Sequence, residues 1–259
     1  MEQFGGGTKG REKELREFCF AGRQDVRLLA RRDGTVVYTA TVCGAPDDTI
    51  DANVTSAMSK VFRIEYGVYD TTRGRFEGTT MRSPTQAECE KNWCLFETPA
   101  GDLKCVYSWF PFVVGRLESD TFVEEHRSTE AKVLRRARGS SHGVPHGDAL
   151  WFLVHIVSYE TPRRYYHAVV VTDTEGTRVE RVSYPFTLEG EPIEYCGSLS
   201  VDDTHLTLHY SVKDAAARSM RVPQAAVRWG YRVAGEAREA VREMMREGKV
   251  GTQQVVAAV

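Results

Sequence analysis

Four β-rich runs, each preceded by a turn, recur along this 259-residue sequence. They are TVVYTATV at 35–42, LKCVYSWFPF at 103–112, ALWFLVHIV at 149–157 and HLTLHYSV at 205–212. β-Branched and aromatic residues dominate these runs, so each repeat predicts a hairpin arm. The runs begin 68, 46 and 56 residues apart. Repeats of roughly 40 to 50 residues, each of a few strands, are typical of a β-propeller, and a β-sandwich is the alternative.

The sequence therefore predicts an all-β fold, a β-propeller of four or five blades over residues 18–234. Alternating patterns at 61–69, and at 165–172 with 177–184, predict further strands. Residues 1–17 are rich in glycine and charge, which predicts a flexible segment. Apolar residues at helical spacing after Gly235 predict a C-terminal helix and tail over 235–259.

The charge balance limits the classes of partner. Lys and Arg number 34 against 36 Asp and Glu, which leaves a net charge of -2 and no electrostatic footprint for nucleic acid. The first 18 residues lack the apolar core of a signal peptide, and no apolar run is long enough to span a membrane. The predicted location is therefore the cytoplasm, without a membrane partner. The sequence leaves the oligomeric state open.

The six cysteines predict reduced thiols. None forms a C-x-x-C pair, and the seven histidines add no zinc-binding spacing. Cys105 and Cys196 fall in apolar strand contexts, which is typical of buried core thiols. We therefore expect no metal and no cofactor, apart from inorganic phosphate as a possible co-substrate of the reaction considered below.

Short motifs at the start of the repeats resemble those of a known enzyme family. The segment QDVR at 24–27 resembles the Glu-Asp-Pro-Arg signature of the five-bladed β-propeller mannoside phosphorylases and their glycosyltransferase-associated relatives. EKNWCLF at 90–96 resembles the Lys-Asn segment of their second blade. RGSS at 138–141 with LVHI at 153–156 resembles their Arg-Gly-Gly-Ser turn and strand-borne histidine. EYCGSL at 194–199 with LHYSVKD at 208–214 resembles their closing blade.

The resemblance covers about residues 23–222 and has two departures. Gln24 stands where the family has Glu, and Val26 where it has Pro. The family also has an N-terminal blade before the Asp-Arg motif, for which only about fifteen residues remain here. The chain thus resembles a divergent, N-terminally short member of the family.

The resemblance implies an inverting attack of phosphate on a glycoside, in which one carboxylic acid protonates the leaving oxygen. Asp25 is then the general acid, and Arg138 and His155 bind phosphate. The implied substrate-binding residues are Arg27, Lys91, Asn92, Ser140 and Asp214. The expected ligand is an oligosaccharide or a sugar phosphate. If the blades are radial, Asp25, Lys91, Arg138, His155 and Asp214 converge on one axial pocket.

Structural roles are open for the same residues. Asp25 and Asp214 fit turns, Arg27 fits a surface position, and His155 fits a hydrogen-bonded core. Lys91 and Asn92 fit a loop before a buried Trp93, and Trp109 and Trp151 are expected to pack in the core rather than stack on sugars. A second class of function follows from these roles: a propeller that has lost catalysis and serves as a glycan- or protein-binding module.

Overall fold

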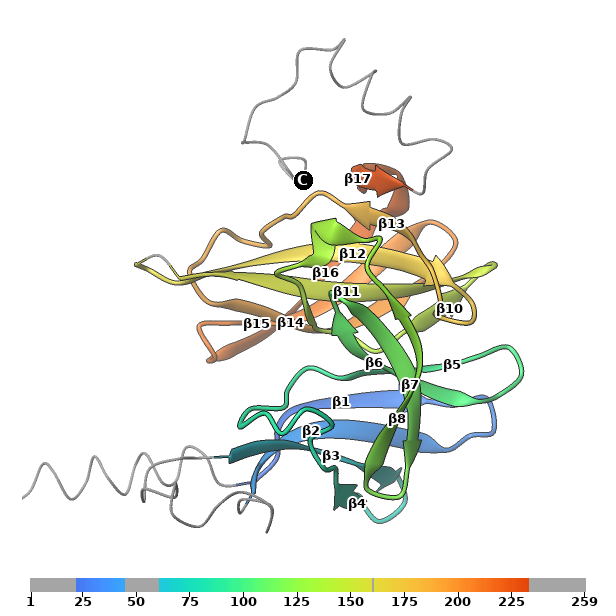
Figure 1. Ribbon diagram of the computed structural model, residues 1–259. Helices are drawn as coiled ribbons and strands as arrows, with labels where there is room; N and C mark the ends of the chain where they lie inside the picture. The colour runs from blue at the N-terminus through green and yellow to red at the C-terminus, as the bar shows by residue number, and fades with distance from the viewer. Residues whose placement is uncertain (1–21, 45–60, 160, 233–259) are drawn as a thin grey trace, which may run out of the picture. The chain divides into compact units, whose positions relative to one another are not determined.

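The structure is a computed structural model that describes residues 22–44, 61–159 and 161–232 (Figure 1). Within these residues the protein is all-β, with four antiparallel sheets and two short 3-10 helices. Each sheet is built mainly from strands that follow one another in sequence, as blades of a β-propeller are. The predicted all-β propeller class is confirmed, and the described residues form four blades.

Blade 1 has the strand order β1-β2-β3-β4. Its strands are β1 (Gln24–Ala30), β2 (Val36–Gly44), β3 (Val61–Asp70) and β4 (Arg75–Thr80). The predicted strand at 61–69 is thus confirmed as β3. Tyr38, Ala40 and Ile64 are completely buried and form the centre of the core of this blade.

Blade 2 has the strand order β5-β6-β7-β8. Its strands are β5 (Cys94–Glu97), β6 (Leu103–Trp109), β7 (Phe112–Glu118) and β8 (Thr121–Ser128). The prediction of one run over 103–112 is wrong at its end, because β6 stops at Trp109 and a turn at Phe110–Pro111 precedes β7. Pro111 has no N–H to donate to the ladder, so a strand cannot pass through it with full pairing.

Blade 3 is the largest sheet. A 3-10 helix, η1 (Lys132–Leu134), precedes it. Its strands are β9 (Arg138–Gly139), β10 (Val144–His146), β11 (Ala149–Ser158), β12 (Arg164–Asp173), β13 (Val179–Ser183) and β17 (Trp229–Arg232). β9 and β10 both pair with β11, and β17 pairs with β13. The predicted hairpin of 165–172 and 177–184 is confirmed as β12 and β13.

Blade 4 has the order β14-β15-β16 and is the smallest sheet. Its strands are β14 (Glu194–Val201), β15 (His205–Val212) and β16 (Ala216–Pro223). A second 3-10 helix, η2 (Gln224–Ala226), leads from β16 towards β17. A register shift between Cys196 and Ser198 marks a bulge in β14.

The chain divides into two compact units. Among the described residues, the first comprises 22–30, 35–44, 61–91 and 119–122, and the second comprises 31–34, 92–118, 123–159 and 161–232. In the second unit, β11 is buried on both faces. Phe152 and Val154 pack in a cluster with blade 2 side chains, whereas Trp151 and Leu153 pack in a cluster with blade 4 side chains. This burial explains the uninterrupted apolar run of β11.

Two predictions lie outside the described residues: the flexible segment at 1–17 and the C-terminal helix over 235–259. Across the parts of the chain that are described, no helix has the length and apolar character needed to cross a membrane.

Candidate functional site

The predicted site residues are divided between the two units. Asp25, Arg27 and Lys91 belong to the first unit. Asn92, Arg138, Ser140, His155 and Asp214 belong to the second. The convergence of all these residues on one pocket stays a prediction.

Asp25 occupies a strained position near the start of β1. Its backbone φ is 50°, in the left-handed region that residues other than glycine seldom adopt. The pairing of β1 with β2 is irregular between Gln24 and Arg27, so Asp25 sits in a bulge. Bulges re-aim side chains, and local strain of this kind gathers at functional sites. The side chain is exposed, and the carboxylate is therefore accessible to a ligand.

Arg27 and Lys91 are held by the protein more firmly than surface residues are. Arg27 is only 3% exposed and lies opposite Thr39 of β2, so its interpretation as a surface arginine is wrong. The Nζ atom of Lys91 lies 4.2 Å from the centre of the Phe62 ring. That distance is typical of a cation–π contact, which limits the positions that the ammonium group can take.

Asn92 lies against the start of blade 3. Its φ of 66° is again left-handed. A Cβ atom on Gly139 would overlap the backbone oxygen of Asn92 and the Sγ atom of Cys94, so only glycine fits at 139. The close approach places Asn92 beside the segment that carries Arg138 and Ser140. Trp93 is 1% exposed, which confirms the predicted buried tryptophan.

Ser140 and His155 form a buried hydrogen-bonded pair. Ser140 Oγ lies 2.8 Å from His155 Nδ1. Ser140 is 0% exposed and His155 is 3% exposed. The pairing of β9 with β11, which sets Arg138 opposite His155, brings the two together. Because Ser140 is covered completely, its direct partner is the imidazole, whose ring it orients.

Two tyrosines that sequence reasoning missed surround His155. The His155 ring centre lies 5.3 Å from that of Tyr195 and 5.9 Å from that of Tyr165. The two tyrosine rings are 6.3 Å apart. Tyr165 lies opposite Val157 in the β11–β12 pair, on the face that His155 shares. The strand alternation could have indicated Tyr165, but the approach of Tyr195 depends on how blade 4 packs against blade 3.

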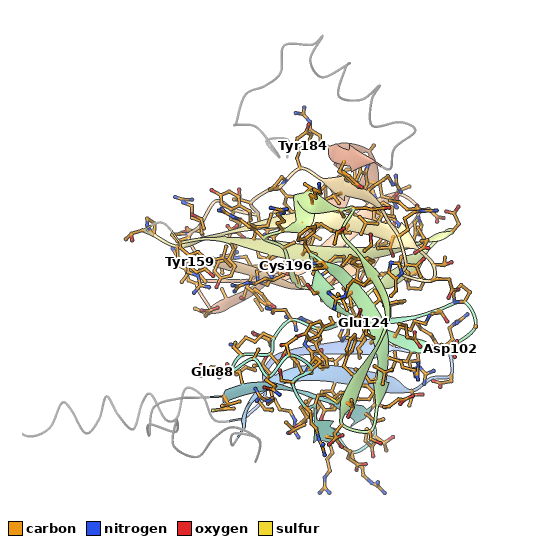
Figure 2. The ribbon with its side chains drawn as sticks, in the orientation of Figure 1. Glu88, Asp102, Glu124, Tyr159, Tyr184 and Cys196 are labelled. Carbon is orange, nitrogen blue, oxygen red and sulfur yellow. The ribbon has the colours of Figure 1, made fainter. Side chains whose placement is uncertain are left out.

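Basic and aromatic side chains extend from the cluster of His155, Tyr165 and Tyr195 towards the end of the β11–β12 hairpin. Tyr159 is 73% exposed and lies at the end of the β11–β12 hairpin (Figure 2). Arg138 Nη2 donates a hydrogen bond of 2.9 Å to the Tyr159 hydroxyl. The guanidinium carbon of Arg163 lies 5.7 Å from the Tyr159 ring centre and 5.0 Å from that of Tyr165. The second unit thus presents a continuous set of polar and aromatic groups from Tyr159 to His155.

Asp214 lies in the turn between β15 and β16. It is exposed, and both Lys213 and Asp214 have a positive φ, 55° and 51°. This geometry agrees with the structural alternative, in which Asp214 is a turn residue. A role in binding sugar stays a prediction.

Glu194 is a buried carboxylate at the start of β14. It is 0% exposed and accepts backbone N–H bonds from Leu188, Glu189 and Glu191 at 2.7 to 2.8 Å. All three donors belong to the loop before β14. The carboxylate therefore organises that loop, and the sequence motif gave no sign of this role.

His167 is a second buried polar group, opposite His155 on the neighbouring strand. Its Nε2 atom accepts the Cys196 N–H at 3.2 Å. Burial lowers the pKa of His167 to about 4, so the ring is neutral near pH 7.

The thiols and tryptophans behave as core residues. Burial raises the pKa of Cys196 to about 12, and it also raises that of Cys105. Both are free thiols, as predicted. Trp109 and Trp151 are 3% and 5% exposed, which confirms their expected place in the core. Among the residues that the structure describes, no group of three or more His, Cys, Asp or Glu side chains is placed to hold a metal ion.

An apolar cavity of about 30 Å³ lies elsewhere in the second unit. Its walls include Val169, Leu206, Leu208, Met220 and Val222. None of the predicted site residues lines it. Its apolar walls offer few groups for a sugar or phosphate, so we regard it as a packing void between blades 3 and 4.

Comparisons with known proteins support the fold. No protein-family model matches the sequence, and no curated protein matches it either. The structure is similar to β-1,2-mannobiose phosphorylase from Listeria innocua, with a TM-score of 0.51 and 13% identity over 79% of this chain and 59% of that one. It is also similar to MPT-1, a GDP-Man-dependent mannosyltransferase from Leishmania mexicana, with a TM-score of 0.50 and 9% identity over 82% of this chain and 70% of that one.

At these identities the likeness concerns the fold. The chain spans about three fifths of the length of the mannobiose phosphorylase.

Proposed function

We propose that this protein is a carbohydrate-active enzyme of the mannoside phosphorylase or mannosyl-transferring type. The observation that carries the proposal is the start of blade 3. There the pairing of β9 with β11 sets Arg138 opposite His155, Ser140 bonds to the His155 ring, and Asn92 lies against Gly139. The two similar structures, a phosphorylase and a transferase that act on mannose compounds, support this choice of chemistry.

In the proposed reaction, phosphate attacks the anomeric carbon from the side opposite the leaving oxygen, which inverts the configuration. The bond to the leaving oxygen breaks, and the carboxylic acid of Asp25 gives its proton to that oxygen. Arg138 and His155 hold the phosphate, because arginine offers paired N–H donors that match its oxygens. Arg27, Lys91, Asn92 and Asp214 are proposed to bind the sugar hydroxyls. Ser140 acts through the ring of His155.

The test is an assay of phosphate in both directions. Manno-oligosaccharides with phosphate should yield mannose 1-phosphate, and mannose 1-phosphate with an acceptor sugar should release phosphate. Arg138→Ala should raise the KM for phosphate about tenfold or more, because a charge-assisted contact is lost. Arg135→Ala, an equal loss of charge in the same segment, is the matched control. A wild-type protein inert in both directions contradicts the proposed reaction.

A second function is favoured by a specific observation. His155 is buried and hydrogen-bonded, as a structural core histidine is, and Gln24 replaces the family's glutamate. These features suit a propeller that binds glycans or a protein without turnover. Calorimetric binding of manno-oligosaccharides by a protein that is inert in both assays supports this alternative.

A further inference from the structure

We propose that Arg138 of β9 and Arg163, which both contact Tyr159 at the end of the β11–β12 hairpin, form a clamp for a ligand that carries a diphosphate group. The inference rests on the proposed function, because Arg138 is shared with the proposed phosphate site. It extends that site to Tyr159 and Arg163, which the sequence motifs do not include.

One exposed tyrosine connects the two guanidinium groups. Arg138 is bonded to the Tyr159 hydroxyl at 2.9 Å, and Arg163 lies 5.7 Å from the centre of the same ring. Arg163 is also 5.0 Å from the Tyr165 ring centre, so two aromatic rings lie within cation–π distance of its guanidinium group. These contacts restrict both arginines before a ligand arrives, which lowers the entropy that binding must remove. Because both arginines contact one ring, a single ligand can reach both.

The two arginines differ in their partners from several exposed arginines among the described residues. Arg82, Arg116 and Arg178 each pair with a carboxylate, at 2.7, 2.6 and 2.8 Å. Among the described residues, neither Arg138 nor Arg163 forms such an ion pair. An arginine side chain stays charged at any physiological pH. The hairpin end therefore holds two positive charges that the described carboxylates do not neutralise, and an anion would neutralise them.

The order of groups along this surface indicates a linked pair of phosphates. Two forked guanidinium groups can each take one phosphate in a bidentate manner. On the inner side, Tyr165, Tyr195 and His155 follow one another in ring contact. On the outer side, the exposed ring of Tyr159 offers a face for a planar group. A nucleoside diphosphate or an inorganic diphosphate brings the required chemistry, and affinity measurements distinguish the two.

The test is calorimetry on the full chain at low salt, with inorganic phosphate, pyrophosphate, ADP and GDP as probes. Pyrophosphate should bind about tenfold or more tightly than phosphate, because it engages the second arginine. Arg163→Ala should remove this preference and leave the affinity for phosphate unchanged. Arg163→Lys keeps the charge but loses the planar fork, so it should restore only part of the preference. Arg178→Ala, in the connection between β12 and β13, is the matched control for loss of charge.

The proposal is overturned if pyrophosphate binds no more tightly than phosphate, or if Arg178→Ala weakens it as much as Arg163→Ala does. Nucleoside diphosphates that bind more tightly than pyrophosphate, with the gain lost in Tyr159→Ala and kept in Tyr159→Phe, identify a nucleotide as the source. Equal affinities identify the diphosphate alone. Tight pyrophosphate binding by a protein inert in both phosphate assays supports the clamp and contradicts the proposed reaction. Turnover without a preference for pyrophosphate supports the proposed reaction and contradicts the clamp.

Discussion

Blades 1 and 4 each carry a carboxylate near the start of their first strand, and the two are used in opposite ways. Asp25 is exposed and sits in a bulge with a left-handed backbone. Glu194 is completely buried, and three backbone N–H groups donate to it. The lone pairs of Glu194 are already engaged by the protein, whereas Asp25 is accessible. The position of a carboxylate in a blade therefore does not by itself define its role. The hydrogen-bond donors around the carboxylate decide whether it stabilises the fold or stays accessible to a ligand.

Asp25→Asn should have the largest effect of the variants proposed here, because it removes the proposed catalytic role of Asp25 and leaves the structural role of Glu194 intact. The amide keeps the size and the hydrogen bonding of the side chain but has no proton to give to the leaving oxygen. Phosphorolysis should therefore fall by about 10²- to 10⁴-fold, with sugar affinity and unfolding free energy nearly unchanged. Rate assays, sugar titrations and urea unfolding measure these three quantities. Asp203→Asn, at an exposed turn, is the control, and an equal loss of rate there removes Asp25 from the catalytic role.

Stability should fall on acidification because of His167, which contacts the strand that Glu194 begins. Its pKa of about 4 lies below the ordinary 6.5, so the unfolded chain takes up the proton first as the pH falls. The contribution of neutral His167 to the free energy of unfolding is therefore complete above about pH 6.5. It is lost as the pH falls towards 4, by up to about 3 kcal/mol. Urea unfolding at pH 7.5, 6 and 4.5 measures it. His167→Gln should reduce the slope, while His209→Gln, at an exposed position, should not; equal slopes in all three proteins reject the assignment.

Glu194→Gln should lower stability without a direct effect on chemistry. The variant loses charge assistance in three hydrogen bonds and turns an amide donor towards backbone N–H groups. We expect a loss of about 2 kcal/mol in the free energy of unfolding. Chemical denaturation measures the change, with Glu77→Gln, at an exposed position of β4, as the control. A Glu194→Gln protein as stable as the wild type would show that the carboxylate does not stabilise the fold, and the contrast with Asp25 would disappear.

Ser140→Ala should have the smallest effect. Loss of the bond to His155 costs about 1 kcal/mol of stability. If Ser140 also orients His155 for phosphate, the KM for phosphate rises while the KM for sugar stays constant. Steady-state kinetics with each substrate varied in turn separate these effects. A rise in both KM values would instead indicate general damage to blade 3.

The elements that the sequence predicted best are those with local signals. β2, β6, β11 and β15 begin within one residue of the predicted runs, because their β-branched and aromatic residues are continuous and bounded by turns. The break at Phe110–Pro111 was missed because apolar residues flank a proline turn on both sides, which hides the boundary.

The candidate site was predictable only where a motif spans a strand pair. Arg138, Ser140 and His155 meet because β9 pairs with β11, and both segments are in the recognised pattern. No site motif includes Tyr159 or Arg163, since their approach depends on the geometry of the hairpin end and not on any local periodicity. The structural role of Glu194 was not predicted for a similar reason. Its three hydrogen-bond donors are backbone N–H groups, and any residue type can supply a backbone N–H.

The pairing of β17 with β13 also bears on the order in which the protein matures on the ribosome. β13 is made before blade 4, but its outer partner is made only after blade 4 is finished. During synthesis, the edge of the β9–β13 sheet therefore remains open until the whole of blade 4 has left the ribosome. An open edge strand can pair with another nascent chain, so this interval is when the protein is most exposed to misassembly.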